Sequence, residues 1–426
     1  MRVPKRNYLA IVTGLMAGIP CVGAPIQMDM QEAVKRALGT RPAHLTAQLD
    51  TVAAKARRHQ AQASWYPTVT PSATYVYSRA RTQLPGFGTA TGVTDETRYE
   101  VGADWLLWDN GRRELRIAQA KHALTSAELS LEQSKHSVTV EAVQAFLDML
   151  RQQELARSQQ ASLERALALQ QMTEAQVEAG ALPRKDLLQA RADAANARVS
   201  LLQTQNRLKQ AETRLKLVTG VPWDAELTLT PPAASPDVPS SLDLCRQLAE
   251  QHRPDIAIAR QSLRIRQLAH QMTVSDAGLN IQARSGAGYR FKPDRGDTVS
   301  VSLVASYPLF DGGLNAALIQ ESRTAIATSE LQLVNSRLEA FTQVEQAWLE
   351  HINAEERLTA ATSALEAAQA NYEAASAGRA EGVGTVIDVV TANASLAQAE
   401  ASAVQARYDL LLAVIQLRVA IGSTAF

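Results

Sequence analysis

The chain has 426 residues, with 43 Lys and Arg against 43 Asp and Glu, and aromatic residues make up only 5% of it. The neutral balance excludes a dedicated nucleic-acid-binding protein, which needs a basic face to neutralise phosphates. Beyond the N-terminus no apolar run approaches the roughly 20 residues of a spanning helix, which excludes a multi-helix membrane protein. The aromatic-poor, Ala- and Leu-rich composition favours long helices packed through small side chains.

Residues 1–24 have the features of a secretory signal peptide. Basic residues begin this segment, an apolar stretch follows at 8–19, and the small residues Val22-Gly23-Ala24 offer a cleavage site. Cys21 lies near the cut, but the residues before it match a lipidation signal poorly. We therefore expect an exported protein whose mature chain keeps one thiol, Cys245, and forms no intramolecular disulfide.

The mature chain contains two similar halves. The segment Trp105–Gly111 recurs at Tyr307–Gly313, 202 positions on, and Arg41-Pro42 recurs as Arg253-Pro254, 212 positions on. Halves of about 200 residues are too long for a solenoid unit and indicate a duplicated architecture. The expected organisation is a signal peptide at 1–24, a first repeat at 25–222, a proline-rich linker at 223–241 and a second repeat at 242–426.

Each repeat is expected to begin with a helix, at 29–63 and 241–276, and to continue with two strands. Apolar and polar residues alternate along these strands, which is the pattern of a sheet with one apolar face. The expected strands cover 66–79, 98–108, 279–291 and 298–310.

The apolar strand faces end in aromatic residues, as a lipid interface favours, and each strand is long enough to cross a bilayer. Four strands cannot close a membrane barrel, and an open edge is not tolerated in lipid, so the chain must oligomerise if these strands span a membrane. Two chains would supply 8 strands and three would supply 12. The candidate membrane-interface aromatics are Tyr75, Tyr77, Tyr99, Trp105, Tyr289, Phe291 and Tyr307.

A long helical hairpin completes each repeat, at 110–219 and at 312–420. Each consists of a helix of about 70 residues, a glycine-containing turn and a shorter return helix. The return helix is shorter than the helix before it, and the first helix of the repeat can supply the difference in length if the two stack end to end. Stretches such as 361–368 and 392–397 have small residues on more than one side, so each helix can pack against two neighbours, as in the wall of a cylinder.

The strand-ending segments Leu107–Gly111 and Leu309–Gly313 and the turn Gly382–Val390 resemble the outer-membrane efflux protein family, the TolC-like channels. The resemblance implies a mainly α homotrimer with a 12-strand membrane β-barrel continued by a 12-helix α-barrel. It also implies a location in the outer membrane, extending into the periplasm.

In function, the resemblance implies a passive exit duct of a tripartite efflux or type I secretion system. Its partners would be a periplasmic adaptor, an inner-membrane transporter and outer-membrane lipid, without catalytic activity or cofactors. Small-molecule efflux is slightly favoured over protein secretion. The alternative is an exported coiled-coil scaffold or adaptor without a membrane barrel.

The family pattern implies a periplasmic entrance at the hairpin turns, with Asp388 at the gate position and Asp186 in the equivalent first turn. Thr391 occupies a second acidic position and Gly384 a basic latch position, so this chain departs from the family at both. Asp388 also has the spacing of a capping box with Thr385, and Asp186 that of a first-turn residue that complements the helix dipole. Capping and gating are compatible roles. The expected adaptor-contacting residues are Gly180, Ala181, Leu182, Gly382, Val383, Gly384 and Thr385.

Other signals predict no further chemistry. The seven histidines are scattered without metal-ligand spacing, so no metal site is expected. Gly86–Gly92 superficially resembles a phosphate-binding loop, but no helix follows it, and a flexible surface loop between strands is expected instead.

Overall fold

The computed structural model describes residues 26–84, 86, 88–232, 238–292 and 294–423. The expected signal peptide and residues 233–237 of the expected linker lie outside these ranges. The chain forms two compact units, each of which draws on both halves of the sequence. The first unit combines Met1–Leu45, Lys135–Cys245 and Val344–Phe426, and the second combines Thr46–Ser134 and Arg246–Gln343.

Two helices precede the strands of each half, where a single helix was expected. The expected helices at 29–63 and 241–276 are both interrupted, at Arg41 and at Arg253. Both arginines have extended backbone, with ψ of 121° and 124°, because the ring of a following proline disfavours the helical conformation. The resulting helices are α2 (Met30–Thr40), α3 (Pro42–Ala63), α6 (Leu242–His252) and α7 (Pro254–Asp276).

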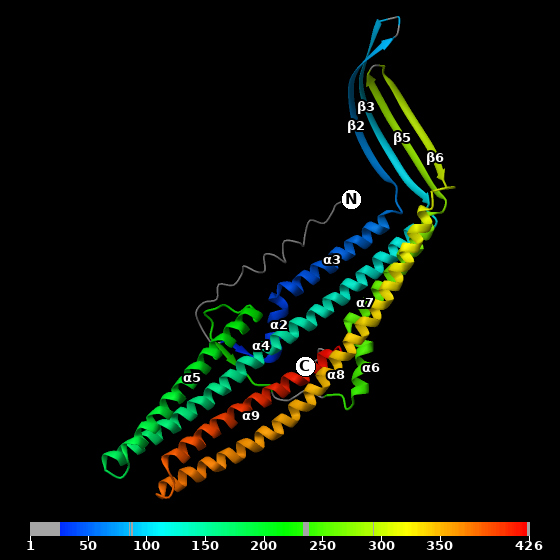
Figure 1. Ribbon diagram of the computed structural model, residues 1–426. Coiled ribbons are helices and arrows are strands. Elements are labelled where there is room, and N and C mark those ends of the chain that lie inside the picture. Colours follow the sequence, from blue (N-terminus) through cyan, green and yellow to red (C-terminus); the bar gives the residue numbers. More distant parts are fainter. Residues whose placement is uncertain (1–25, 85, 87, 233–237, 293, 424–426) are drawn as a thin grey trace. The chain divides into compact units, whose positions relative to one another are not determined.

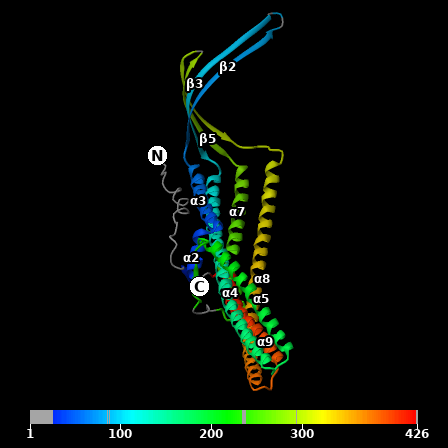
Figure 2. The same ribbon diagram turned by 90° about the vertical axis from the view of Figure 1, so that its left-hand side faces the viewer.

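The second unit contains one antiparallel sheet with the strand order β2-β3-β5-β6 (Figures 1 and 2). Its strands are β2 (Thr68–Leu84), β3 (Gly88–Trp108), β5 (Asn280–Lys292) and β6 (Gly296–Ser306).

Three of these strands, β2, β3 and β6, differ markedly from the sequence-based expectation. The β2–β3 hairpin continues to the pair Leu84 and Gly88, so most of the expected loop at 86–92 is strand. Backbone ladder bonds hold this extension, and they require no alternation of apolar side chains. Strand β6 ends at Ser306 rather than at 310, because Pro308 has no N–H to donate to a ladder.

The strand register brings the apolar residues of all four strands to one face of the sheet. Tyr99 lies opposite both Ala73 and Tyr289, and Leu303 lies opposite Ala283. Directly opposed residues point to the same side of a sheet, and side chains alternate along each strand. Between the register shifts of β3 and β5 at Thr97/Arg98 and Leu106/Trp108, the odd-numbered residues therefore share one face, and the apolar alternation predicted for each strand extends across the sheet.

The long helical hairpins have the lengths that the sequence predicts. Helices α4 and α8 each have 67 residues, and the return helices have 36 and 35. The bounds are α4 (Arg112–Glu178), α5 (Arg184–Thr219), α8 (Leu314–Ala380) and α9 (Val386–Ala420).

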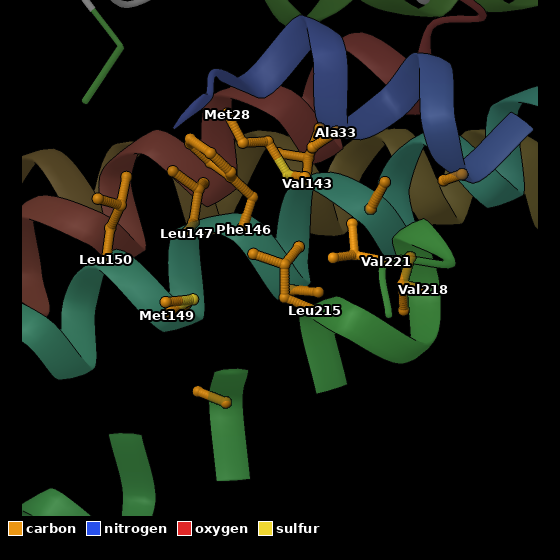
Figure 3. Close-up of a cluster of buried hydrophobic side chains, with 14 of the residues drawn as sticks. Met28, Ala33, Val143, Phe146, Leu147, Met149, Leu150, Leu215, Val218 and Val221 are labelled. Carbon is orange, nitrogen blue, oxygen red and sulfur yellow. The ribbon is translucent and has the colours of Figure 1, made fainter. Parts of the chain in front are cut away.

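A large core of the first unit surrounds Phe146, which is fully buried. Figure 3 shows Met28 and Ala33 against Val143 and Phe146 of α4, with Leu215 of α5 approaching the same helix. Burying a large apolar side chain contributes roughly 1.5–3 kcal/mol, so this cluster stabilises the joint between the hairpins and the N-terminal segment.

A short parallel sheet that the sequence did not predict borders this core. Strand β1 (Ile26–Met28) pairs with β4 (Leu227–Leu229), which lies inside the expected linker. Partly buried Leu227 and Leu229 pack against the Phe146 cluster, so this part of the linker is ordered by the core. No helix in the described part of the chain has both the length and the apolar character needed to cross a membrane.

Candidate functional site: the hairpin tips

The turn between α4 and α5 is closed by a glycine with left-handed backbone. Gly180 has a φ of +74° and its N–H donates to Val177 O at 3.0 Å. The next residue, Ala181, donates to Gln176 O at 2.8 Å. These two bonds form a Schellman motif, which satisfies the last carbonyls of α4 and reverses the chain.

The turn between α8 and α9 repeats this geometry. Gly382 has a φ of +82° and donates to Arg379 O at 3.2 Å, and Val383 donates to Gly378 O at 2.9 Å. The Val383 side chain is 86% exposed, so the turn presents an apolar residue to its surroundings.

Gly384 lies directly against the end of α8. A Cβ atom added there would be 3.0 Å from Arg379 N and 3.2 Å from Gly378 C, and both of these are backbone atoms that cannot rotate away. A side chain at this position would therefore require the end of α8 to shift by a few tenths of an ångström, which favours glycine.

Asp388 and Thr385 form a reciprocal capping box at the start of α9, as their spacing predicted. Thr385 donates to Asp388 Oδ2 from its N–H at 2.9 Å and from its hydroxyl at 2.7 Å, while Asp388 N–H donates back to the hydroxyl at 3.2 Å. The hydrogen bonds from the Thr385 hydroxyl and N–H lower the pKa of Asp388 below its ordinary value of 3.8. The carboxylate is exposed and remains charged at neutral and mildly acidic pH.

The other two expected entrance residues are not joined to Asp388. Asp186 lies in the first turn of α5, where Pro183 is the N-cap, and Thr391 is exposed one turn beyond Asp388 on α9. Among the described residues no hydrogen bond or ion pair connects Asp186 with Asp388. The capping box is therefore a feature of the second hairpin.

An apolar cluster joins the two hairpins just above the turns. Leu169 of α4 and Ala190 of α5 pack with Val386 and Val389 of α9. Leu182 of the first turn packs against this cluster, so this expected adaptor-contacting residue also has a structural role.

A polar network links the same hairpins further along the helices, and sequence reasoning missed it. Arg165 of α4 donates from Nε to Asn393 Oδ1 at 2.9 Å, and its guanidinium lies 3.3 Å from the Glu400 carboxylate. Ser158 donates to the same carboxylate at 2.6 Å, and the Arg165 guanidinium lies over the Tyr372 ring of α8. Three helices from both hairpins therefore meet at one arginine.

The sequence contains one signal that points to this network. Val386, Val389, Asn393 and Leu396 are buried and follow the spacing of a coiled-coil seam, with asparagine at one seam position. A polar residue at such a position commonly fixes the register of packed helices. Its partner lies 228 residues away, so no local pattern identifies Arg165.

One buried and one half-buried polar group also lie near the tips. Arg379 is buried and donates to Gln176 of α4, although its Nε has no hydrogen-bond partner among the described residues. Desolvation raises the pKa of the half-buried Asp193 carboxyl on α5, while a hydrogen bond with Asn393 acts in the opposite direction. Burial near the tips thus disfavours the charged form of the Asp193 carboxyl.

The expected membrane-interface aromatics lie in the second unit. Tyr99, Tyr289 and Phe291 form an edge-to-face cluster, with ring centroids 5.4 Å apart for Tyr99 and Phe291 and 4.7 Å apart for Tyr289 and Phe291. Trp105 donates to Trp65 O at 3.1 Å. The remaining three, Tyr75, Tyr77 and Tyr307, are exposed, with Tyr307 just beyond the end of β6.

Comparison with known proteins decides the family. The sequence profile described as "Outer membrane efflux protein" matches residues 33–221 and 245–423, which together are most of the chain. The chain belongs to the outer membrane efflux protein family.

Individual relatives agree with this assignment. The chain is 23% identical over 378 residues to the outer membrane efflux protein BepC of Brucella suis, covering 85% of this chain and 78% of BepC. It is 25% identical over 360 residues to the outer membrane protein TolC of Vibrio cholerae, covering 78% of this chain and 76% of TolC. The crystal structure of CusC has the same fold, with a TM-score of 0.82, 18% identity and 96% coverage of both chains.

Membership of this efflux family has three direct consequences. The protein is an outer-membrane channel component and not an enzyme. It serves efflux or secretion as an exit duct, the role of the outer-membrane component in tripartite systems. The alternative of an exported coiled-coil scaffold is therefore wrong. The described residues contain no cluster of His, Cys, Asp and Glu suited to a metal ion.

Proposed function

We propose that three copies of the chain form a passive duct, with a 12-strand β-barrel in the outer membrane continued by a 12-helix tunnel in the periplasm. One observation carries this proposal. The sheet has four strands, one apolar face and two outer edges, on β2 and β6, that pair with no other described strand. Unpaired edges are not tolerated in lipid, and four strands are too few to close, so other copies must complete the sheet.

The spacing of the aromatic residues suits a membrane-spanning sheet. Tyr99 and Trp105 lie on the same face of β3, six residues apart, which corresponds to about 20 Å along a strand. Transmembrane barrels have an apolar band of about 25 Å with aromatic residues at both borders. The cluster of Tyr99, Tyr289 and Phe291 would lie at one border, and Trp105 and Tyr307 at the other.

We propose that the hairpin tips form the periplasmic entrance. Three symmetry-related Asp388 carboxylates would line it and favour cations, as rings of acidic residues do in cation channels. The lowered pKa of Asp388 keeps this ring charged in the periplasm. Asp186 and Thr391 would lie at the same entrance, with only Asp186 adding charge.

The turns themselves are the proposed contact with a periplasmic adaptor, which would connect the duct to an inner-membrane transporter. Val383 and Ile387 are exposed apolar residues at the second tip, and Leu188 is exposed near the first. Buried apolar contacts surrounded by polar residues are typical of protein interfaces. The proposed contact residues are Gly180, Ala181, Leu182, Gly382, Val383, Gly384 and Thr385.

Small-molecule efflux is the proposed use of this duct, in preference to type I protein secretion. The similarity to BepC, which is named for efflux, supports this choice. A deletion strain tests it directly. Increased sensitivity to drugs with an unchanged secreted-protein profile is expected, and a lost secreted protein without a change in drug sensitivity would contradict it.

Two substitutions separate the charge of Asp388 from its capping role. Asp388→Asn removes the charge but keeps an oxygen that accepts from Thr385, whereas Thr385→Ala removes the cap and keeps the charge. In planar bilayers we expect Asp388→Asn to reduce cation selectivity and block by multivalent cations, and Thr385→Ala to preserve both. Unchanged selectivity and block in Asp388→Asn would contradict the entrance ring.

A further inference from the structure

The internal duplication supplies a template for the contact between copies. Within one chain, β3 of the first half pairs with β5 of the second half. The counterpart of β3 is β6, 202 positions on, and the counterpart of β5 is β2, 212 positions back. These counterparts are the two outer edges of the sheet. The β3·β5 ladder therefore indicates how β6 of one copy meets β2 of the next.

The template has a definite register. Tyr99 lies opposite Tyr289, and Val101 lies opposite Ala287. The counterparts of Tyr99 and Tyr289 are Val301 and Tyr77, and those of Val101 and Ala287 are Leu303 and Tyr75.

Resting on the trimer proposed above, we propose that β6 pairs antiparallel with β2 of a neighbouring copy in this register, with Val301 opposite Tyr77 of the partner subunit and Leu303 opposite Tyr75 of the partner subunit. The side-chain faces satisfy a first requirement. Val301 and Leu303 lie on the apolar face of β6, and Tyr77 and Tyr75 lie on the apolar face of β2. A shift of one residue would place apolar side chains on opposite faces of the joined sheet.

The sizes of the side chains that meet where the strands join the long helices also suit this pairing. Asn110 lies so close to Gly278 that a Cβ there would be 2.3 Å from Asn110 Nδ2. The counterpart of Asn110 is Gly312, and the counterpart of Gly278 is Tyr66. Between copies, the glycine would therefore lie on the side of α8 and the larger residue on the side of β2. Tyr66 is 75% exposed in the single chain, and a neighbour with glycine at 312 leaves space for it.

Exposed apolar residues surround this corner. The side chains of Leu309 and Phe310, just before Gly312, are both 91% exposed. The equivalent corner of the first half, at the start of α4, is covered by residues of the same chain. There the Arg113 guanidinium lies 4.2 Å from the Trp65 ring centre and donates to Leu106 O and Leu107 O. The second half has Asn315 in place of Arg113. A neighbouring copy would cover the exposed side chains of Leu309 and Phe310 at this corner.

Disulfide trapping in the full-length protein tests the register. The double variant Tyr77→Cys with Val301→Cys has opposed thiols in the proposed register, and Tyr75→Cys with Val301→Cys is the matched control, shifted by two residues on the same face. Within one chain β2 and β6 are separated by two strands, about 14 Å, which exceeds the Cα separation that a disulfide spans. Any disulfide between these positions therefore joins different copies. Native Cys245 is buried and is present in both variants.

We expect the first variant to convert most of the protein to a covalent trimer on non-reducing gels, and the control to give only a trace. A particle of three chains that crosslinks in the control and not in the first variant would overturn the register and leave the trimer intact, as would a trimer that crosslinks in neither. A monomer in detergent would overturn the trimer itself. The mass of the unsubstituted protein in detergent distinguishes the two failures.

Discussion

Arg165 of α4 donates a hydrogen bond from Nε to Asn393 Oδ1 of α9 at 2.9 Å and thereby ties the first helical hairpin to the second. The same guanidinium meets Glu400 of α9 and lies over the Tyr372 ring of α8. A planar, permanently charged group with several donors suits this position, because lysine would provide neither the second contact nor the stacking. This contact therefore adds to the apolar cluster of Leu169 and Val389 in holding the two hairpins together near their tips.

The first prediction concerns the acceptor in that contact. Asn393→Ala leaves Arg165 Nε without its partner in a largely buried site, and we expect a loss of about 1–3 kcal/mol in stability. Thermal unfolding of the purified protein measures the effect. Ser395→Ala, on the exposed face of the same helix, is the control and should leave the melting temperature unchanged. Equal melting temperatures for the two variants would show that the contact does not stabilise the hairpins.

The second prediction concerns the pH dependence of Asp193. Its pKa is raised by burial, and one carboxylate oxygen, Oδ2, is buried without a hydrogen-bond partner. The folded state therefore holds the proton more tightly than the unfolded state, and this group costs stability once the pH exceeds its unfolded pKa. Asp193→Asn should raise the melting temperature at neutral pH, and the gain should shrink as the pH falls toward 3.8. A gain that is independent of pH would contradict this explanation.

The third prediction concerns a tyrosine buried between α4 and α9. The Tyr408 hydroxyl donates to Glu154 Oε1 at 2.8 Å, and burial together with this bond raises its pKa far above the ordinary value of 10. Tyr408→Phe removes the donor and should cost about 1.5–3 kcal/mol, the range for hydrogen bonds to charged groups. Tyr372→Phe, which keeps the ring against Arg165, is the matched control in thermal unfolding. A melting temperature equal to that of the control would show that the bond is not stabilising.

The fourth prediction compares two glycines in one turn. Gly382→Ala should cost about 1–2 kcal/mol, because an L-residue is strained at its positive φ. Gly384→Ala meets rigid backbone and should displace the end of α8, which also disturbs the contact of Arg379 with Gln176. Limited proteolysis at the tip should therefore be faster for Gly384→Ala than for Gly382→Ala. Equal rates would indicate that the turn accommodates a side chain at 384.

Features that depend on neighbouring residues could be predicted from the sequence. The two long helices, their glycine turns and the Thr385–Asp388 capping box all follow from patterns a few residues long. The apolar faces of the strands could be predicted equally well, because apolar and polar residues alternate along each strand with a period of two residues. The break at Arg41 was missed, although the proline after it gives a local reason.

Features that depend on distant residues could not be predicted. The pairing of β1 with β4 depends on the core around Phe146, which assembles from several segments of the chain. The partnership of Arg165 with Asn393 likewise requires both hairpins to be in place. The extension of β2 and β3 toward Gly88 has no apolar alternation, so no local pattern indicates it. Sequence patterns report the faces of an element and not its partners.

The most direct test of the proposed duct is the single-channel conductance of the purified mature protein in a planar bilayer, measured together with its mass in detergent. The proposal predicts a particle of three chains and stepwise conductance that prefers cations. A monomer that produces no conductance would contradict it.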